Sequence, residues 1–192
     1  MRPAVFLDRD GTVIQEQGYL GRLDLVQPFP YAAGAIRLLR DAGFAVVIVT
    51  NQAGVARGFF DEVFVRAAHD HLSALLAAGG AVVDGYYYCP HHPEGTVERY
   101  RMACRCRKPG PGMIEMAARE LDLDVQGSFV VGDKWLDVGL AENAGAAGVL
   151  VRTGYGVESE RDLRGCAPAA IVDTLLDAAH WILEAAGTSR MR

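Results

Sequence analysis

The 192-residue sequence has no apolar run of the roughly 18 residues that a membrane-spanning helix needs. Its amino terminus lacks the basic start and apolar core of a secretory signal, so we expect a cytoplasmic protein. Internal repeats and low-complexity tracts are absent. With 51% hydrophobic residues, the composition predicts a single domain over residues 1–187 and a frayed tail at 188–192.

The sequence also has no excess of positive charge. Lys and Arg total 19 against 24 Asp and Glu, which gives a formal net charge of -5. A broad face for binding nucleic acid is therefore not expected, although a local basic pocket can still hold one anion. We expect a small anionic substrate, no nucleic-acid or membrane partner, and a monomer.

Cysteines are few, four in all, and three of them lie in a short segment beside histidines. Three thiolates and one imidazole form a closed tetrahedral set that suits structural Zn2+. The candidate ligands are Cys89, His91, Cys104 and Cys106. Three alternatives stay open: cysteines without a metal, a disulfide between Cys104 and Cys106, and His92 in place of His91. Cys166 stands apart and is expected to be a spare thiol.

Apolar, often β-branched runs predict five strands, at residues 4–7, 44–49, 82–88, 129–131 and 148–151. Helical spacing lies between and after them, at 32–42, 61–78, 112–121, 135–144 and 170–186. Strands that alternate with helices predict an α/β fold with a single Rossmann-like parallel sheet and helices on both faces. The segments 9–30 and 89–111 fit neither element and are expected to be functional loops.

Polar residues follow three of these predicted strands. Asp8 ends the first, Thr50 the second and Asp133 the fourth. Ligands bind beyond the carboxyl ends of such strands, so we expect these side chains to converge. Asp10 is two residues from Asp8, and a turn at Gly11 lets both carboxylates approach one centre. Taken alone, the same residues also suit an Asx-type turn, and Thr50 suits a helix cap.

Carboxylates that converge in this way favour Mg2+, which takes oxygen ligands. We expect the ion to bind Asp8, Asp133 and a carbonyl in the turn at Asp10. Asp8 is also the candidate nucleophile, because a carboxylate can attack phosphorus and form an aspartyl-phosphate. Asp10 is then the acid that protonates the leaving oxygen and the base that activates water. Lys108 and the Thr50 hydroxyl are expected to stabilise the transferred phosphoryl group; alone, Lys108 also suits a solvated loop.

Together these residues resemble the motifs of the haloacid dehalogenase-type (HAD) phosphatase superfamily. In chain order the motifs are Asp8-Arg9-Asp10-Gly11-Thr12, Thr50, Lys108, and Gly132-Asp133-Lys134 followed by Asp137. Within it, the chain is similar over nearly its whole length to the heptose-bisphosphate phosphatases. The stretches that carry this similarity are the zinc segment, residues 50–54 with 56–58, and residues 106–109. The resemblance implies a capless fold, and neither long loop has room for a cap domain.

The resemblance further implies an Mg2+-dependent enzyme that removes the C7 phosphate of D-glycero-D-manno-heptose 1,7-bisphosphate in nucleotide-activated heptose biosynthesis. It implies a structural zinc in the loop 89–106. It also implies substrate contacts at Glu16, Gln17, Gly18, Tyr19, Thr50, Asn51, Gln52, Ala53, Arg107, Lys108 and Lys134. Whether the heptose serves lipopolysaccharide or another glycan stays open, as does the preferred anomer.

Other functions are disfavoured by specific features. Histidinol-phosphate phosphatases share the motifs, but the spacing from His91 to Cys104 and the pair Gly18-Tyr19 favour the heptose type; a promiscuous sugar phosphatase stays possible. A zinc-stapled module that binds nucleic acid needs a basic face, whereas this chain is acidic. A phosphotransferase or mutase needs a lid against water, and no segment predicts one.

Overall fold

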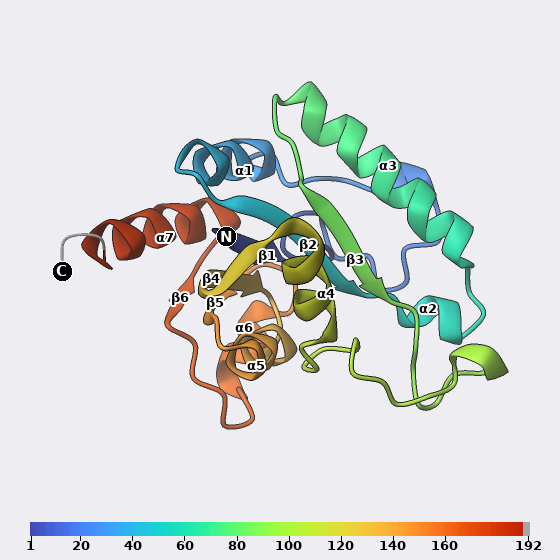
Figure 1. Cartoon of the computed structure of the whole chain (residues 1–192). Coiled ribbons are helices and arrows are strands. Elements are labelled where there is room, and N and C mark those ends of the chain that lie inside the picture. Colours follow the sequence, from blue (N-terminus) through green and yellow to red (C-terminus); the bar gives the residue numbers. More distant parts are fainter. Residues whose placement is uncertain (190–192) are drawn as a thin grey trace.

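A parallel sheet of six strands forms the centre of the computed structural model, which describes residues 1–189 (Figure 1). The strands are β1 (Arg2–Leu7), β2 (Ala45–Asn51), β3 (Gly85–Cys89), β4 (Leu123–Gly132), β5 (Ala147–Val151) and β6 (Ala170–Val172). Their order across the sheet is β3-β2-β1-β4-β5-β6, the doubly wound order of Rossmann-like folds. β1 therefore lies inside the sheet and pairs with both β2 and β4.

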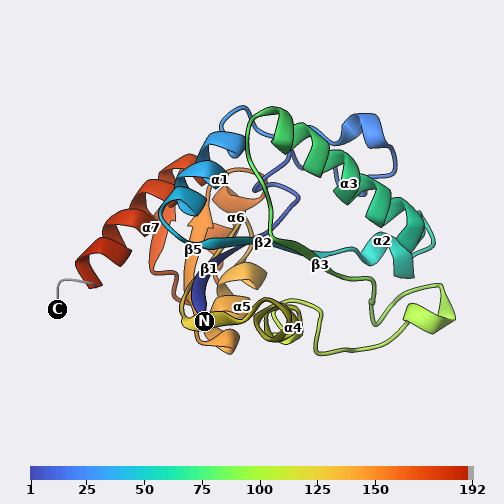
Figure 2. The same cartoon turned by 45° about the horizontal axis from the view of Figure 1, so that its top comes forward.

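Helices cover both faces of this sheet. They are α1 (Ala32–Asp41), α2 (Ala53–Ala56), α3 (Glu62–Ala78), α4 (Gly112–Leu121), α5 (Trp135–Ala144), α6 (Gly156–Arg161) and α7 (Leu175–Ser189), with 3-10 turns η1 (Leu23–Leu25) and η2 (Glu98–Tyr100). Because side chains alternate along a strand, Val5 and Leu7 of β1 pack with α1, α3 and α7, whereas Ala4 and Phe6 pack with α4 and α5. Figure 2 shows these two helix layers above and below the sheet.

The central strands are continuous apolar runs because neither of their faces meets water. Residues 4–7 of β1 and 45–50 of β2 are all buried. Burying one Val, Leu or Phe side chain stabilises the fold by about 1.5 to 3 kcal/mol. The inner strands thus form a rigid base for the polar residues that follow them.

The fold class is the predicted one, but residues 170–186 do not form a single helix. Ala170–Val172 form β6, and α7 begins only at Leu175. The break lies at Thr174, whose backbone N–H donates to Asp177 Oδ2 at 3.1 Å while the Asp177 N–H donates to Thr174 Oγ1 at 3.2 Å. This reciprocal cap starts the helix after the strand, and the Thr-x-x-Asp spacing is its signal in the sequence.

The third strand is also shorter at its start than predicted, since Val82 and Val83 precede it. Asp84 ends the connection, because its carboxylate accepts the Val46 N–H at 2.8 Å. β4 is longer than predicted and shifts register against β1 between Pro3 and Val5. These differences lie at the edge of the sheet far from the strands' carboxyl ends.

The two long loops leave that carboxyl edge open. Within residues 1–189, the connections from β1 to α1 and from β3 to α4 contain the 3-10 turns η1 and η2 but no cap domain, as predicted. α7 extends through Ser189 and so includes the first two residues of the predicted tail; residues 190–192 lie outside the described part. Across the described helices, none has the length and apolar character needed to cross a membrane.

Candidate active site

A cavity of about 260 Å³ opens at the carboxyl edge of the sheet. Most of the predicted catalytic and substrate-contact residues line it, namely Asp8, Asp10, Glu16, Gly18, Tyr19, Thr50, Asn51, Gln52, Ala53, Arg107, Lys108 and Lys134. Gln17 was predicted as a contact but does not line the cavity. Six further lining residues had no predicted contact: Arg9, Leu20, Gly54, Phe60, Leu136 and Asp137. The residues that follow β1, β2 and β4 therefore converge as the topology requires.

The ammonium group of Lys108 lies between two buried carboxylates. Its Nζ donates to Asp8 Oδ1 at 2.6 Å and to Asp137 Oδ1 at 2.7 Å. Burial alone would lower the pKa of Lys108, but the charges and hydrogen bonds of Asp137 and Asp8 outweigh it and raise the pKa above its ordinary value. Lys108 is thus a fixed cation rather than a solvated loop lysine.

Asn51 at the end of β2 holds the backbone of Lys108 in place. Its Oδ1 accepts the Lys108 N–H at 3.0 Å, and its Nδ2 donates to the Lys108 carbonyl at 3.4 Å. A strand end of the rigid sheet therefore sets the position of a residue that belongs to a long loop. The hydrogen bonds also explain why an Asn follows Thr50 here.

Asp137 is a site residue to which the sequence assigned a motif but no role. Its Oδ2 accepts the Lys134 N–H at 3.0 Å, which caps the start of α5, and its Oδ1 accepts from Lys108. Both carboxylate oxygens are thus engaged. The signal that could have found this is the three-residue spacing from Lys134, which is the spacing of a capping box. Asp137 positions Lys108.

The buried carboxylate of Asp133 lies close to those of Asp8 and Asp137. Carboxylate oxygens of Asp8, Asp133 and Asp137 lie within 4.8 Å of one another. Asp133 Oδ2 accepts the Tyr155 N–H at 2.8 Å. Within residues 1–189, Oδ1 has no hydrogen-bond partner and only a 3.5 Å ion pair with Lys134. A carboxylate oxygen that accepts no hydrogen bond and lies near other carboxylate oxygens can serve as a ligand for a hard cation such as Mg2+.

The electrostatics of these carboxylates agree with that fit. Burial, and secondly the charge of Asp8, raise the pKa of Asp133 to about 8. Burial raises the pKa of Asp8 to about 6, although Lys108 opposes the shift. Without a cation, the chain's own charges do not compensate both carboxylates at neutral pH.

The carboxylate of Asp10 is held in one orientation by its neighbours. Arg9, only 2% exposed, donates from Nε at 3.1 Å and from Nη2 at 3.0 Å. Gln52 Nε2 donates to Asp10 Oδ2 at 3.1 Å and to Thr50 Oγ1 at 2.9 Å. Gly11, with φ +88°, then turns the chain away from the strand direction. Asp10 and Thr50 thus belong to one polar network on the cavity wall.

The loop after β1 is tied across the cavity to the start of α5. Lys134 Nζ donates to Glu16 Oε2 at 3.1 Å, and Glu16 Oε1 accepts the Gly18 N–H at 2.7 Å. Burial would lower the pKa of Lys134, but Asp8, Asp133 and Glu16 raise it well above its ordinary value. Lys134 is therefore a second cation at the cavity.

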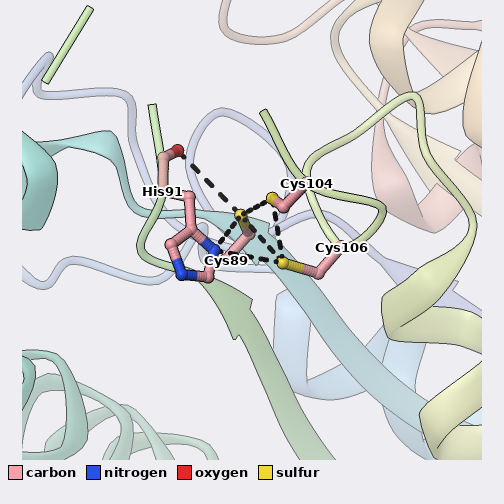
Figure 3. Close-up of side chains that lie close together, drawn as sticks. All are labelled: Cys89, His91, Cys104 and Cys106. Atoms are coloured by element: carbon pink, nitrogen blue, oxygen red, sulfur yellow. Dashed lines mark hydrogen bonds between the residues drawn. The ribbon is translucent and has the colours of Figure 1, made fainter. Parts of the chain in front are cut away.

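Three cysteines and one histidine meet beside the cavity (Figure 3). The sulfur atoms of Cys89, Cys104 and Cys106 lie 3.2 to 3.4 Å apart, and His91 Nδ1 lies 3.4 Å from Cys106 Sγ and 3.7 Å from Cys89 Sγ. Metal–sulfur bonds of about 2.3 Å would give tetrahedron edges of about 3.8 Å, so the four groups can hold a tetrahedral ion. All four cysteines of the chain are free thiols, which excludes the disulfide alternative.

The neighbouring histidine points elsewhere. His92 Nδ1 accepts the Glu94 N–H at 3.1 Å, and its Nε2 lies 3.4 Å from Arg57 Nη2. Of the two histidines, His91 is therefore the one that lies among the three cysteines. Its carbonyl accepts from Arg107 Nη1 at 3.2 Å, which connects the cluster to a residue of the cavity rim.

Comparisons with known proteins agree with this geometry. Residues 105–178 match a family model described as HAD-hydrolase-like. D-glycero-beta-D-manno-heptose-1,7-bisphosphate 7-phosphatase from Photorhabdus laumondii is 44% identical over 176 residues, covering 91% of this chain and 92% of its own. D-glycero-D-manno-heptose-1,7-bisphosphate 7-phosphatase from Thermosynechococcus vestitus is 45% identical over 190 residues, covering 94% and 95%.

A solved structure is similar over the same extent. The crystal structure of D,D-heptose 1,7-bisphosphate phosphatase from B. bronchiseptica, complexed with magnesium and phosphate, has a TM-score of 0.84 and 37% sequence identity, covering 96% of this chain and 99% of that one. The sequence motifs, the order of the strands, the residues that line the cavity and the similar proteins all indicate the same family. The chain is a phosphatase and belongs to the D-glycero-D-manno-heptose-1,7-bisphosphate 7-phosphatase family of HAD-like hydrolases.

Proposed function

We propose that the protein removes the C7 phosphate of D-glycero-D-manno-heptose 1,7-bisphosphate through an aspartyl-phosphate on Asp8, in an Mg2+-dependent reaction. The observation that carries this is the position of Asp8, which lines the cavity 2.6 Å from the Lys108 ammonium and beside Asp10. The names of the relatives supply the substrate, and the solved relative contains magnesium and phosphate.

The residues proposed to hold Mg2+ are Asp8, Asp133 and a backbone carbonyl at Asp10. The Oδ1 atom of Asp133, which accepts no hydrogen bond from the described residues, supports this assignment most directly. When bound, the ion supplies positive charge that screens the phosphate dianion from the carboxylates and stabilises charge at phosphorus. We keep Asp137 as a positioning residue because both of its oxygens already accept hydrogen bonds.

In the first step, a carboxylate oxygen of Asp8 attacks phosphorus. The new bond to Asp8 forms as the bond from phosphorus to the C7 oxygen breaks, and protonated Asp10 gives its proton to that oxygen. The cation of Lys108 and the Thr50 hydroxyl stabilise the transferred group. The heptose 1-phosphate then leaves with its new hydroxyl group.

In the second step, Asp10 acts as a base. Its carboxylate takes a proton from water while the water oxygen attacks phosphorus and the bond to Asp8 breaks. Inorganic phosphate is released, Asp8 is a carboxylate again, and Asp10 is protonated for the next cycle. Arg9 and Gln52 keep Asp10 in place for both proton transfers.

We further propose that the Cys/His cluster binds a structural Zn2+. Four protein ligands leave no open position for water, so the site suits a structural ion rather than a catalytic one. The cluster ends at Cys106, next to Arg107, and the His91 carbonyl accepts from Arg107. Zinc would thereby hold Arg107 in place, and we propose that the charge of Arg107 selects a bisphosphate substrate.

The substrate assignment is tested by measuring kcat/KM on both anomers of the heptose bisphosphate, on fructose 1,6-bisphosphate and on histidinol phosphate. We expect one heptose anomer to be the best substrate. Better turnover of histidinol phosphate contradicts the assignment, and similar values on all four indicate a promiscuous sugar phosphatase instead.

A further inference from the structure

Two exposed aromatic side chains meet at the rim of the cavity. Tyr19, in the loop after β1, is 49% exposed, and Phe59, in the connection from α2 to α3, is 59% exposed. Their ring centroids lie 4.6 Å apart with an interplanar angle of 70°. This edge-to-face geometry is the one that aromatic quadrupoles favour. The contact joins two segments that are far apart in the sequence.

The neighbouring residues Phe59 and Phe60 place their rings in different surroundings. Gly58 follows α2 with φ +73°, a conformation that glycine adopts without strain, and the Phe59 N–H donates to the Gly54 carbonyl at 2.9 Å. The next residue, Phe60, lies so close to Gly54 that a Cβ there would be 2.2 Å from its ring. Phe60 lines the cavity, whereas Phe59 does not and instead contacts Tyr19.

The contact lies on a loop whose first half is already anchored. Glu16 accepts from Lys134 and from the Gly18 N–H, which ties residues 16–18 to α5. Beyond Tyr19 the loop continues to η1, which lies beside α3 in both views (Figures 1 and 2). Tyr19 lines the cavity between these two attachments. Among the described residues, its hydroxyl has no hydrogen-bond partner and is free for a ligand.

We propose that Phe59 is a positioning residue that holds Tyr19 over the part of the cavity that receives the leaving group. The described residues include no cap domain, so few surfaces can cover a sugar at this cavity. A tyrosine that is already held in place loses less entropy when the substrate binds. Phe59 needs no contact with the substrate for this role. The inference rests on the proposed function for the identity of the leaving group, a phosphorylated heptose.

The kinetic test compares Phe59→Ala with Phe59→Leu and with Val63→Ala, a control that removes another exposed apolar side chain, 63% exposed, at the start of α3. We expect Phe59→Ala to raise KM for the heptose bisphosphate about 2- to 10-fold with little change in kcat, since an aromatic pair contributes this much. Acetyl phosphate, which carries no sugar for Tyr19 to cover, should react equally well with these three variants. Phe59→Leu should raise KM less than Phe59→Ala does, and Val63→Ala should have the KM of wild type.

A double-mutant cycle tests whether Phe59 acts through Tyr19. If it does, adding Phe59→Ala to Tyr19→Ala changes KM no further. Independent effects of the two substitutions, or an unchanged KM in Phe59→Ala, overturn the proposal.

Limited trypsin digestion gives a readout that needs no substrate. The side chain of Arg22, in the same loop, is 72% exposed. Phe59→Ala should speed cleavage after Arg22, and Val63→Ala should not. If wild type does not hydrolyse the heptose bisphosphate, the proposed function is wrong, and the KM comparison is then made on the best sugar phosphate found. An unchanged cleavage rate in Phe59→Ala overturns the role of Phe59 itself.

Discussion

Lys108 donates a 2.6 Å hydrogen bond to Asp8 across 100 residues of sequence. The same ammonium binds Asp137, so one cation compensates the candidate nucleophile and the cap of α5. Since all three groups are buried, removing one leaves the others without compensation. Lys108 thus belongs to the packing around the candidate nucleophile as well as to the proposed chemistry.

Replacing Lys108 with methionine should therefore lower both activity and stability, whereas replacing a surface lysine typically changes neither by much. Loss of one charge-stabilising donor typically lowers kcat by about 100- to 1,000-fold. Breaking a buried ion pair costs about 3 to 5 kcal/mol of stability in metal-free protein. Steady-state kinetics and urea unfolding measure the two effects. Wild-type values for Lys108→Met would show that the buried cation does nothing at this site.

Asp133 and Asp137 should differ in their effect on Mg2+. Asp133→Asn removes the proposed ligand charge and should raise the Mg2+ concentration for half-maximal activity by more than about 10-fold. Asp137→Asn removes a support of Lys108 and should lower kcat while leaving the Mg2+ requirement nearly unchanged. Titration of activity with MgCl2 separates the two. A larger shift for Asp137→Asn would identify Asp137 as the ligand instead.

The metal-free protein should lose stability as pH rises. A carboxyl group whose pKa is higher in the folded than in the unfolded chain stabilises the fold when protonated, and this contribution is lost between the two pKa values. For Asp133 the window runs from its ordinary value of 3.8 to about 8. In EDTA, the Tm should decrease as the pH is raised from 5.5 to 8.5. This decrease should be smaller for Asp133→Asn in EDTA, and smaller for wild type when Mg2+ replaces EDTA. A Tm that rises over this range in EDTA contradicts the buried, uncompensated carboxylate.

Freshly purified protein should contain one zinc ion per chain. Cys104→Ser should weaken its retention and raise KM for the bisphosphate more than it lowers kcat, because the cluster holds Arg107 rather than the nucleophile. Cys166→Ser is the matched control, since Cys166 lies outside the cluster. Elemental analysis by mass spectrometry measures the zinc, and its absence from wild type would remove the structural role proposed for it.

The convergence of Asp8, Thr50 and Asp133 could be predicted from the sequence because it follows from topology. Each residue lies at or just after the carboxyl end of a strand, and parallel strands present these ends at one edge of the sheet. The cysteine and histidine spacing was likewise sufficient to predict the cluster, because the chemistry of a tetrahedral ion limits the residue types.

Contacts made by loops could not be predicted in the same way. Lys108 reaches Asp8 because Asn51 holds its backbone, and no periodic pattern encodes that pairing. The edge contact of Tyr19 with Phe59 depends on the turn at Gly58. β6 was missed because its three residues merge with an apolar helix in the sequence, and only the cap at Thr174 separates them.

The proposed mechanism requires that Asp8 becomes phosphorylated during turnover. Asp10→Asn should let phosphoryl transfer begin slowly but block activation of water, so that mixing with the bisphosphate and quenching in acid should leave phosphate on the chain. Peptide mapping by mass spectrometry should then place the phosphate on Asp8, and Asp8→Asn should carry none and show no turnover. Phosphate on another residue, or turnover retained in Asp8→Asn, would contradict the mechanism.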